Sequence, residues 1–271
     1  MPELPEVETI RCGIEPFIKG RRVTQVIVRT PRLRWPVPVD LASRLCGETI
    51  QGVERRAKYL LLRTEVGTLL IHLGMSGFLR VLQPLQPPGK HDHADVVFDG
   101  GICLRLNDVR RFGALLWLDG DPRQHSLLAD LGPEPLSAEL TGDYLYQRSQ
   151  GRRLAVKPFI MDSKVVVGVG NIYANESLFR AGIDPSRAAG RLSLARYQRL
   201  VQVIRQVLQE AIAAGGTTLR DFSDQDGRPG YFAQQLQVYG RAGKPCSICG
   251  QAIVKIQLGQ RSTYFCRQCQ R

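Results

Sequence analysis

Two pairs of cysteines near the carboxyl end constrain the fold of this 271-residue chain more than any other feature. Two residues separate the members of each pair, and sixteen residues separate the pairs. Paired knuckles of this spacing bring four thiolates to one tetrahedral Zn²⁺, and a four-thiolate site is closed and therefore structural. So small a unit lacks a core of its own, so we predict a ribbon of short strands held by one structural zinc ion. The predicted ligands are Cys246, Cys249, Cys266 and Cys269.

The other cysteines, Cys12, Cys46 and Cys103, are scattered through segments with helix or strand patterns. We expect these three to be buried free thiols and not disulfides, as is usual inside cells. No apolar run reaches the length of a membrane span, and the amino end lacks a signal-peptide pattern. We therefore expect a cytoplasmic protein that is not bound to a membrane.

The net charge of +12 is concentrated in the second half of the chain. Residues 1–150 carry 19 Lys and Arg against 18 Asp and Glu, whereas residues 151–271 carry 18 against 7. The two halves thus have net charges of +1 and +11. General solubility does not require such asymmetry, which indicates binding to a polyanion, most commonly nucleic acid.

Short apolar runs separated by turn residues occupy residues 22–119 and predict antiparallel strands. Many such strands in a short stretch suggest a sandwich or a flattened barrel. The composition changes near residue 130, and the clearest amphipathic helix covers residues 194–214. We predict an α+β multidomain fold, with an amino-terminal antiparallel β-sandwich and flanking helices, then a helical domain and the zinc ribbon.

The changes in composition also predict the domain boundaries. The predicted domains are the β-sandwich at 1–130, a linker at 131–150, the helical domain at 151–240 and the four-cysteine finger at 241–271. Residues 217–239 contain glycines and aromatic residues with little periodicity. Because a loop this long is usually functional or disordered, and this one is rich in aromatic residues, we expect it to close over a ligand.

The chain begins Met1-Pro2-Glu3, which places unusual chemistry at its amino end. If Met1 is removed, the chain starts with a secondary amine, and a terminal amine is roughly a tenth neutral near pH 7. Attack of this amine on a sugar aldehyde carbon gives an iminium that stays cationic and acts as an electron sink. Glu3 can serve beside it as general acid or base. The same residues also suit the start of a helix at Pro5, and both interpretations can hold.

Two further motifs favour contact with nucleic acid. Gly168-Val169-Gly170-Asn171 precedes a predicted helix over 172–179, with Asn171 as its N-cap and an anion site at its first turn. In Arg110-Arg111-Phe112, an arginine lies next but one to a phenylalanine on a predicted turn, as in probes that wedge between stacked bases.

Taken together, these motifs resemble the bacterial formamidopyrimidine-DNA glycosylases, repair enzymes for oxidised purines. The resemblance covers essentially the whole chain, and its motifs are residues 2–8, 56–60, 72–77, 90–93, 110–113, 168–173 and the four cysteines. It implies a monomeric enzyme that holds duplex DNA with oxidised bases or abasic sites between a β-sandwich and a helix–two turns–helix domain. The damaged nucleotide is flipped out of the duplex.

The resemblance also implies roles for individual residues. Pro2 is the nucleophile at the sugar C1′ and Glu3 its acid–base partner, while Lys58 and Arg261 serve as proton donors in β- and δ-elimination. The implied DNA contacts are His91, Arg110, Arg153 and Asn171, and the residues implied to fill the space of the flipped base are Met75, Arg110 and Phe112. The loop 217–239 covers the oxidised purine. Val109 replaces the proline of many members, which we expect to alter loop stiffness and not chemistry.

Two other functions compete with this one. Endonuclease VIII shares the terminal Pro-Glu, the helical motif and the finger, but prefers oxidised pyrimidines. The segment Leu4–Val7, the Met75 and Arg110–Phe112 set and the long loop favour the purine enzyme. A non-catalytic zinc protein that binds DNA by charge would explain the basic half, but not the position of Pro2 and Glu3.

We predict that the affinity of this chain for duplex DNA falls steeply as salt rises, because each phosphate contact releases condensed counterions. Fluorescence anisotropy with a labelled duplex at several concentrations of KCl measures the slope of log K against log salt. A flat response would contradict the assignment of the basic half to a polyanion.

Overall fold

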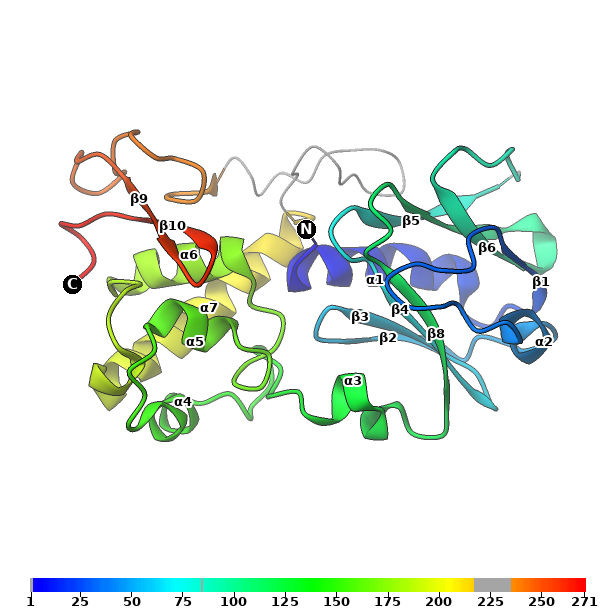
Figure 1. Ribbon diagram of the computed structural model, residues 1–271, viewed down its shortest axis with the longest axis horizontal. Coiled ribbons are helices and arrows are strands. Elements are labelled where there is room, and N and C mark those ends of the chain that lie inside the picture. Colours follow the sequence, from blue (N-terminus) through cyan, green and yellow to red (C-terminus); the bar gives the residue numbers. More distant parts are fainter. Residues whose placement is uncertain (1, 84, 217–234) are drawn as a thin grey trace. The chain divides into compact units, whose positions relative to one another are not determined.

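The computed structural model describes residues 2–83, 85–216 and 235–271 (Figure 1). The chain divides into two compact units, of which the first contains the chain up to Ala129. The second contains Asp130–Ala214 and the described residues from 235 onward. Within the described ranges, no helix is long and apolar enough to cross a lipid bilayer.

Two four-stranded antiparallel sheets form the first unit, which confirms the predicted β-sandwich. Their strand orders are β1-β6-β7-β5 and β2-β3-β4-β8. The strands are β1 (Val23–Val28), β2 (Gly52–Arg56), β3 (Tyr59–Arg63), β4 (Gly67–His72), β5 (Gly77–Leu82), β6 (Asp92–Phe98), β7 (Cys103–Asp108) and β8 (Ala114–Asp119). One apolar core draws side chains from both sheets.

Helix α1 (Leu4–Ile18) packs on the same core, because Val7, Ile10 and Ile14 recur at helical spacing along one face. It begins one residue earlier than predicted, and Glu3 is its N-cap. The other helices described in this unit are short, namely α2 (Leu41–Leu45), α3 (Ser126–Ala129), η1 (Asp99–Gly101) and η2 (Pro122–Gln124).

The second unit is helical as predicted. Its helices are α4 (Gly142–Ser149), α5 (Val156–Met161), α6 (Asn171–Ala181), η3 (Ala189–Arg191) and α7 (Leu194–Ala213). Helix α7 ends where Gly215 adopts a φ of 74°, so its predicted extent was correct. The predicted linker 131–150 was wrong, since it contains α4, and Leu140 and Leu145 are buried in the core of this unit.

Strands β9 (Val254–Leu258) and β10 (Arg261–Phe265) pair antiparallel and form the predicted ribbon. A third, small apolar cluster supports it, made of Phe179, Val238, Cys246, Ile253 and Cys266. Since Phe179 belongs to α6, the ribbon shares its core with the helical unit. Residues 217–234, most of the predicted loop 217–239, lie outside the described residues.

A buried ion pair joins two neighbouring strands, β6 and β7, of the sheet β1-β6-β7-β5. Arg105 on β7 is 2% exposed and donates two hydrogen bonds of 2.8 Å to the carboxylate of Asp95 on β6. The same guanidinium donates to the carbonyls of Gln86 and Pro87 at 2.8 and 3.2 Å. Arg105 thus holds the segment that leads from β5 to β6, and His91 lies at the end of that segment.

We predict that Arg105→Met lowers the free energy of unfolding by about 3 kcal/mol, because the buried carboxylate of Asp95 loses two hydrogen bonds from arginine and keeps only the one from Arg29. Urea unfolding followed by circular dichroism measures this change. Arg21→Ala is the matched control, because Arg21 pairs with Asp99 at the surface, and such pairs contribute about 1 kcal/mol or less. Equal losses for the two variants would contradict a special role for the buried pair.

Candidate active site and nucleic-acid interface

The amino end of α1 positions the predicted nucleophile and its acid–base partner. Pro2 lies just before Glu3, the N-cap, and both residues are buried. The backbone N–H of Glu3 donates to a carboxylate oxygen of Glu6 at 2.8 Å, and the carbonyl of Glu3 accepts from Val7 N at 3.1 Å. The backbone of Glu3 is thereby fixed, and Pro2 is held at the positive end of the helix.

Lys58 lies in the two-residue turn between β2 and β3, where Ala57 has a φ of 54°. Arg55 donates to the carbonyl of Ala57 at 3.0 Å and to Glu8 of α1 at 2.7 Å. Burial raises the pKa of Glu8, but hydrogen bonds from Arg11 and Arg55 outweigh it and hold that pKa below its ordinary value. Glu8 is therefore ionised at neutral pH and ties the Lys58 turn to α1.

His72, at the end of β4, is a neutral neighbour of Lys58. Burial, and then the positive charges of Arg34 and Lys58, lower the pKa of His72 to about 4. Its Nδ1 accepts from the backbone N–H of Gly74 at 3.1 Å, and its ring centroid lies 4.9 Å from that of Tyr59. At pH 7 the imidazole therefore adds no positive charge beside Lys58.

The predicted space-filling residues lie on two loops at one end of a sheet. Met75 precedes β5, and Arg110 and Phe112 follow β7, which is the antiparallel neighbour of β5. The guanidinium of Arg110 lies 4.9 Å from the ring centroid of Phe112. Arg111 between them has a φ of 56°, a conformation that non-glycine residues rarely adopt and that is concentrated at functional loops.

In the second unit, the structure corrects the predicted cap of α6. Gly170 is the N-cap, because its carbonyl already accepts the first helical bond, from Ala174 N at 2.9 Å. Asn171 is therefore the first residue of the helix, and its buried Oδ1 accepts no hydrogen bond from the described residues. Its side chain is not used for capping. Arg153 is exposed on the segment that precedes α5.

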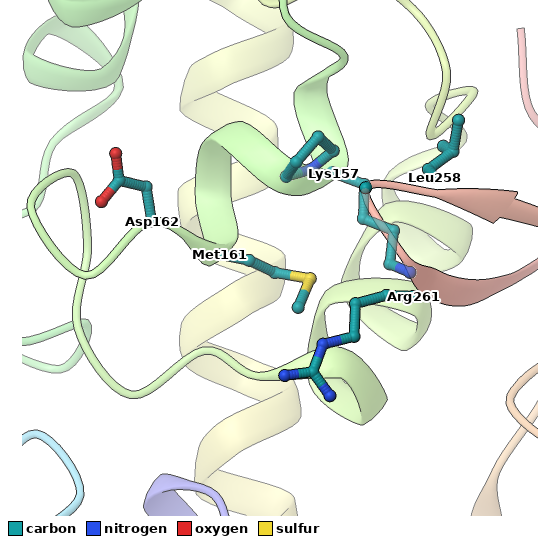
Figure 2. A pocket seen from close by; sticks show the side chains of 7 residues that line it. Lys157, Met161, Asp162, Leu258 and Arg261 are labelled. Carbon is teal, nitrogen blue, oxygen red and sulfur yellow. The ribbon is translucent and has the colours of Figure 1, made fainter.

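Arg261 begins β10 directly after a tight turn. Gly259 and Gln260 have φ values of 52° and 60°, as in the two-residue hairpin turns that match the twist of paired strands. The exposed side chain of Arg261 lines a pocket of about 260 Å³ between this turn and α5 (Figure 2). The other lining residues are Lys157, Pro158, Met161, Asp162, Leu258 and Gly259.

Lys157 of α5 fastens this hairpin to the helices. It is 1% exposed, and its Nζ donates to the Ser262 carbonyl at 2.9 Å and to Thr263 Oγ1 at 2.7 Å. On α6, Asn175 Oδ1 accepts from Tyr264 N at 2.7 Å. Neither residue stands out in the sequence, because a lysine or asparagine in a helix is ordinarily exposed.

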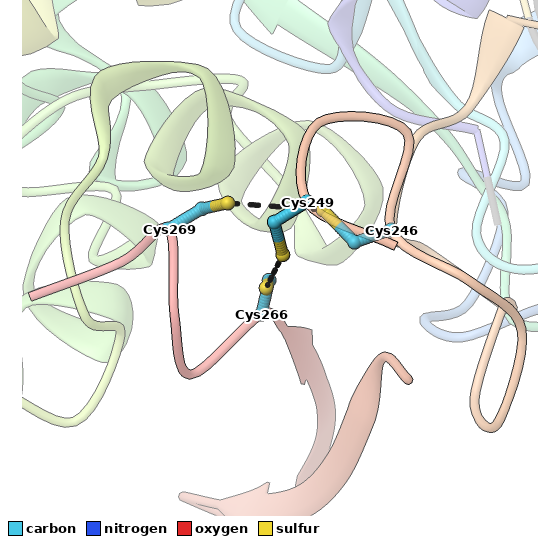
Figure 3. Close-up of side chains that lie close together, drawn as sticks. All are labelled: Cys246, Cys249, Cys266 and Cys269. Carbon is cyan, nitrogen blue, oxygen red and sulfur yellow. Dashed lines mark hydrogen bonds between the residues drawn. The ribbon is translucent and has the colours of Figure 1, made fainter. Parts of the chain in front are cut away.

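The four predicted zinc ligands converge on one point (Figure 3). Their sulfur atoms all lie within 4.8 Å of one another, with 3.9 Å between Cys246 and Cys269 and 3.4 Å between Cys249 and Cys266. Tetrahedral Zn–S bonds of about 2.3 Å place sulfur atoms about 3.8 Å apart, so the cluster fits the ion. The chain therefore has one structural zinc site.

Three family models match the chain in this order. They describe the formamidopyrimidine-DNA glycosylase N-terminal domain at 1–115, the H2TH domain of the same glycosylase at 131–223, and a zinc finger found in FPG and IleRS at 243–271. Formamidopyrimidine-DNA glycosylases of Syntrophotalea carbinolica and Thioalkalivibrio sulfidiphilus are each 62% identical to this chain over 100% of both sequences.

Solved structures that resemble this chain belong to the same family as the matching sequences. A Lactococcus lactis FPG variant in complex with DNA containing Fapy-dG is 34% identical, with a TM-score of 0.93 over 100% of both chains. The MutM (FPG) protein of Thermus thermophilus is 38% identical, with a TM-score of 0.89 over 99% of this chain and 98% of that one.

A β-sandwich followed by a helix–two turns–helix domain and a four-thiolate finger defines a class of DNA glycosylases that act in base-excision repair. The three family models and the full-length relatives place the chain within that class. It belongs to the formamidopyrimidine-DNA glycosylase family.

We predict that removing zinc disorders roughly the last thirty residues and weakens DNA binding, because metal binding is coupled to folding in such ribbons. Cys249→Ser should lower the zinc content and the affinity for duplex DNA together. The predicted burial was wrong for Cys12 and Cys46, which are both exposed, and right for Cys103. Cys12→Ser is the control, because Cys12 lies on α1, outside the zinc cluster. Full DNA affinity after verified loss of zinc would refute the prediction.

Proposed function

We propose that this enzyme removes 8-oxoguanine and formamidopyrimidines from duplex DNA and then cleaves the strand by β,δ-elimination, as a monomer in the bacterial cytoplasm. Relatives bind DNA that contains Fapy-dG, an abasic site or carbocyclic 8-oxo-G, which supports this range of substrates. The observation that carries the proposal is the position of Pro2 and Glu3 at the amino end of α1, with the Lys58 turn tied to the same helix.

In the proposed reaction, the amine of Pro2 acts after Met1 is removed. Its lone pair forms a bond to C1′ as the bond from C1′ to the base breaks, and Glu3 transfers the protons. The sugar ring then opens, as the C1′–O4′ bond breaks and Glu3 protonates O4′, and the nitrogen lone pair forms an iminium. This iminium has no proton to lose, so it withdraws electrons from C2′ and makes the C2′ proton acidic. Loss of that proton expels the 3′ phosphate, and a second elimination expels the 5′ phosphate.

Lys58 and Arg261 are the proposed proton donors for the first and second elimination. In the structure, Lys58 occupies a rigid turn and Arg261 begins a hairpin that Lys157 and the zinc site hold in place. A structural metal thus contributes to catalysis only by positioning. The product is a gap of one nucleotide with phosphates at both ends.

The remaining predicted residues are proposed to bind the DNA. His91, Arg110 and Arg153 contact the DNA and Asn171 contacts a phosphate, and the basic second half of the chain provides the favourable electrostatic field. Met75, Arg110 and Phe112 fill the space of the flipped nucleotide, as apolar wedges do in other DNA-bending proteins. The loop 217–239 is proposed to cover the oxidised purine.

We predict that borohydride traps a covalent adduct between this enzyme and a duplex with 8-oxoguanine opposite cytosine. Reduction converts the iminium into a stable amine, and mass spectrometry should locate the adduct at Pro2. Two residues added before Pro2 should abolish trapping, because they convert the amine into an amide, while duplex binding remains. The same two residues added after Arg271 are the matched control and should leave trapping unchanged.

Three outcomes separate the candidate functions. An adduct on 8-oxoguanine at Pro2 supports the proposal. An adduct only on thymine glycol would favour an endonuclease VIII activity for oxidised pyrimidines. Binding without any adduct on either lesion would leave only the non-catalytic DNA-binding function.

A further inference from the structure

We propose that Asp108 is a positioning residue that clamps together the two loops that bear Met75, Arg110 and Phe112. The inference rests on the space-filling role proposed above for these side chains. Asp108 itself is 0% exposed, so it acts through the loops and not by touching DNA.

The register of the sheet brings the two loops together at their base. Gly77, the first residue of β5, pairs with Asp108, the last residue of β7. The loop at 73–76 therefore enters the sheet beside the point where the loop at 109–113 leaves it. Asp108 lies at the junction, between segments more than thirty residues apart in sequence.

The carboxylate of Asp108 binds both loops. Its Oδ1 accepts from Ser76 Oγ at 2.7 Å and from Arg110 N at 3.2 Å, and its Oδ2 accepts from Gly113 N at 2.7 Å. Ser76 Oγ in turn accepts from Arg110 N at 3.1 Å. One carboxylate thus joins the loop of Met75 to both ends of the turn that presents Arg110 and Phe112.

The two loops also pack backbone against backbone, so their separation is sharply defined. Gly74 has a φ of 63°, and a Cβ there would overlap the carbonyl group of Phe112. A Cβ on Gly113 would lie 2.8 Å from the His72 carbonyl oxygen and 3.0 Å from Asp108 Oδ2. Only glycine at both positions allows this approach.

The main chain of Asp108 extends the clamp to a third segment. Its N–H donates to the carbonyl of His91 at 3.0 Å, and its carbonyl accepts from His93 Nε2 at 2.7 Å. Since a carbonyl only accepts, Nε2 carries the proton, and Nδ1 of His93 forms a hydrogen bond of 2.8 Å with Thr30 Oγ1. The backbone of His91, a proposed DNA contact, is therefore positioned by the same residue.

The clamp is buried, while the side chains above it are exposed. Phe112 is 45% exposed and Arg110 is also exposed, whereas Ser76, Asp108 and Gly113 are buried. The strained φ of Arg111 persists only if its surroundings hold it, and the bonds to Arg110 N and Gly113 N flank it on both sides. Because the lower part of both loops is fixed, the exposed side chains lose less conformational entropy when they enter a duplex.

Asp108→Asn tests the clamp with little change of volume. Whichever way the amide is turned, its NH2 group faces a backbone N–H, either that of Arg110 or that of Gly113. One of the two bonds from the carboxylate to the turn at 109–113 is then lost, which loosens that turn, whereas the apolar core of the sandwich is untouched. Ser76→Ala is a second variant. It removes the bond between the loop of Met75 and the carboxylate, while Arg110 N and Gly113 N keep their bonds to Asp108.

The measurement compares two substrates that both react through the proposed Pro2 iminium but differ in loop insertion. Excision of 8-oxoguanine opposite cytosine requires the probes to replace the flipped nucleotide, whereas cleavage of an abasic site in single-stranded DNA has no partner base to separate. We expect Asp108→Asn to lower the first rate by about ten- to a hundredfold and to leave the second within about twofold. Ser76→Ala should show a smaller loss in the same direction.

A fluorescence measurement tests the same loops without turnover. In a duplex with 2-aminopurine opposite a tetrahydrofuran abasic analogue, insertion of the probes changes the emission of the orphaned base. We expect a smaller change with Asp108→Asn at saturating protein. Asp99→Asn is the control for both assays, because Asp99 is exposed in η1, at the other end of the β6–β7 hairpin.

The clamp would be refuted if Asp108→Asn lowered the cleavage rates of both substrates by the same factor. It would also be refuted if the ratio of the two rates and the fluorescence change both stayed as in the wild type. If the wild type does not excise 8-oxoguanine, the proposed function fails. The fluorescence comparison then still decides whether Asp108 positions the loops.

Discussion

Buried carboxylates whose hydrogen-bond donors come from loops outside their own helix or strand are the constraint on which both units depend. Burying a carboxylate costs several kcal/mol of folding free energy unless hydrogen-bond donors surround it. The donors must therefore come together when the chain folds. In the first unit, Asp108 joins two loops in this way. In the second, Glu176 of α6 is 0% exposed and accepts from the backbones of Gln237, Val238 and Tyr239 at 2.9, 3.0 and 2.8 Å.

The sequence predicted those parts of the fold that depend on short-range patterns. The cysteine spacing predicted the zinc ribbon, and the helical period predicted α7 to within a residue. The linker at 131–150 was wrong, because Gly132, Pro133 and Pro135 mark only its beginning, and Leu145 then packs on the helices. The cap of α6 was wrong because a local rule selects the best capping side chain, whereas the hydrogen bonds of the helix already begin at the carbonyl of Gly170.

For the site, the motifs identified candidate residues but not their supports. Pro2, Glu3 and Lys58 stand in recognisable motifs, and their roles remain predictions. Arg55, Asp108 and Lys157 had no such signal, since each acts on partners that only the fold brings close. Lys157, for example, reaches residues more than a hundred positions away in sequence. An isolated charge in a sequence is ordinarily exposed, and only its burial in the structure identifies it as a support.

The shared core of the zinc ribbon has a consequence for how this protein divides into modules. Phe179 of α6 completes the apolar cluster around Cys246 and Cys266, and Lys157 and Asn175 fasten the strands. A boundary near residue 241 therefore marks a change of sequence pattern and not a limit of cooperative folding. A finger moved to another protein would keep its zinc ligands but lose its contacts with α5 and α6. A chimaera with a foreign finger must therefore also carry the surface of α5 and α6 that packs against that finger.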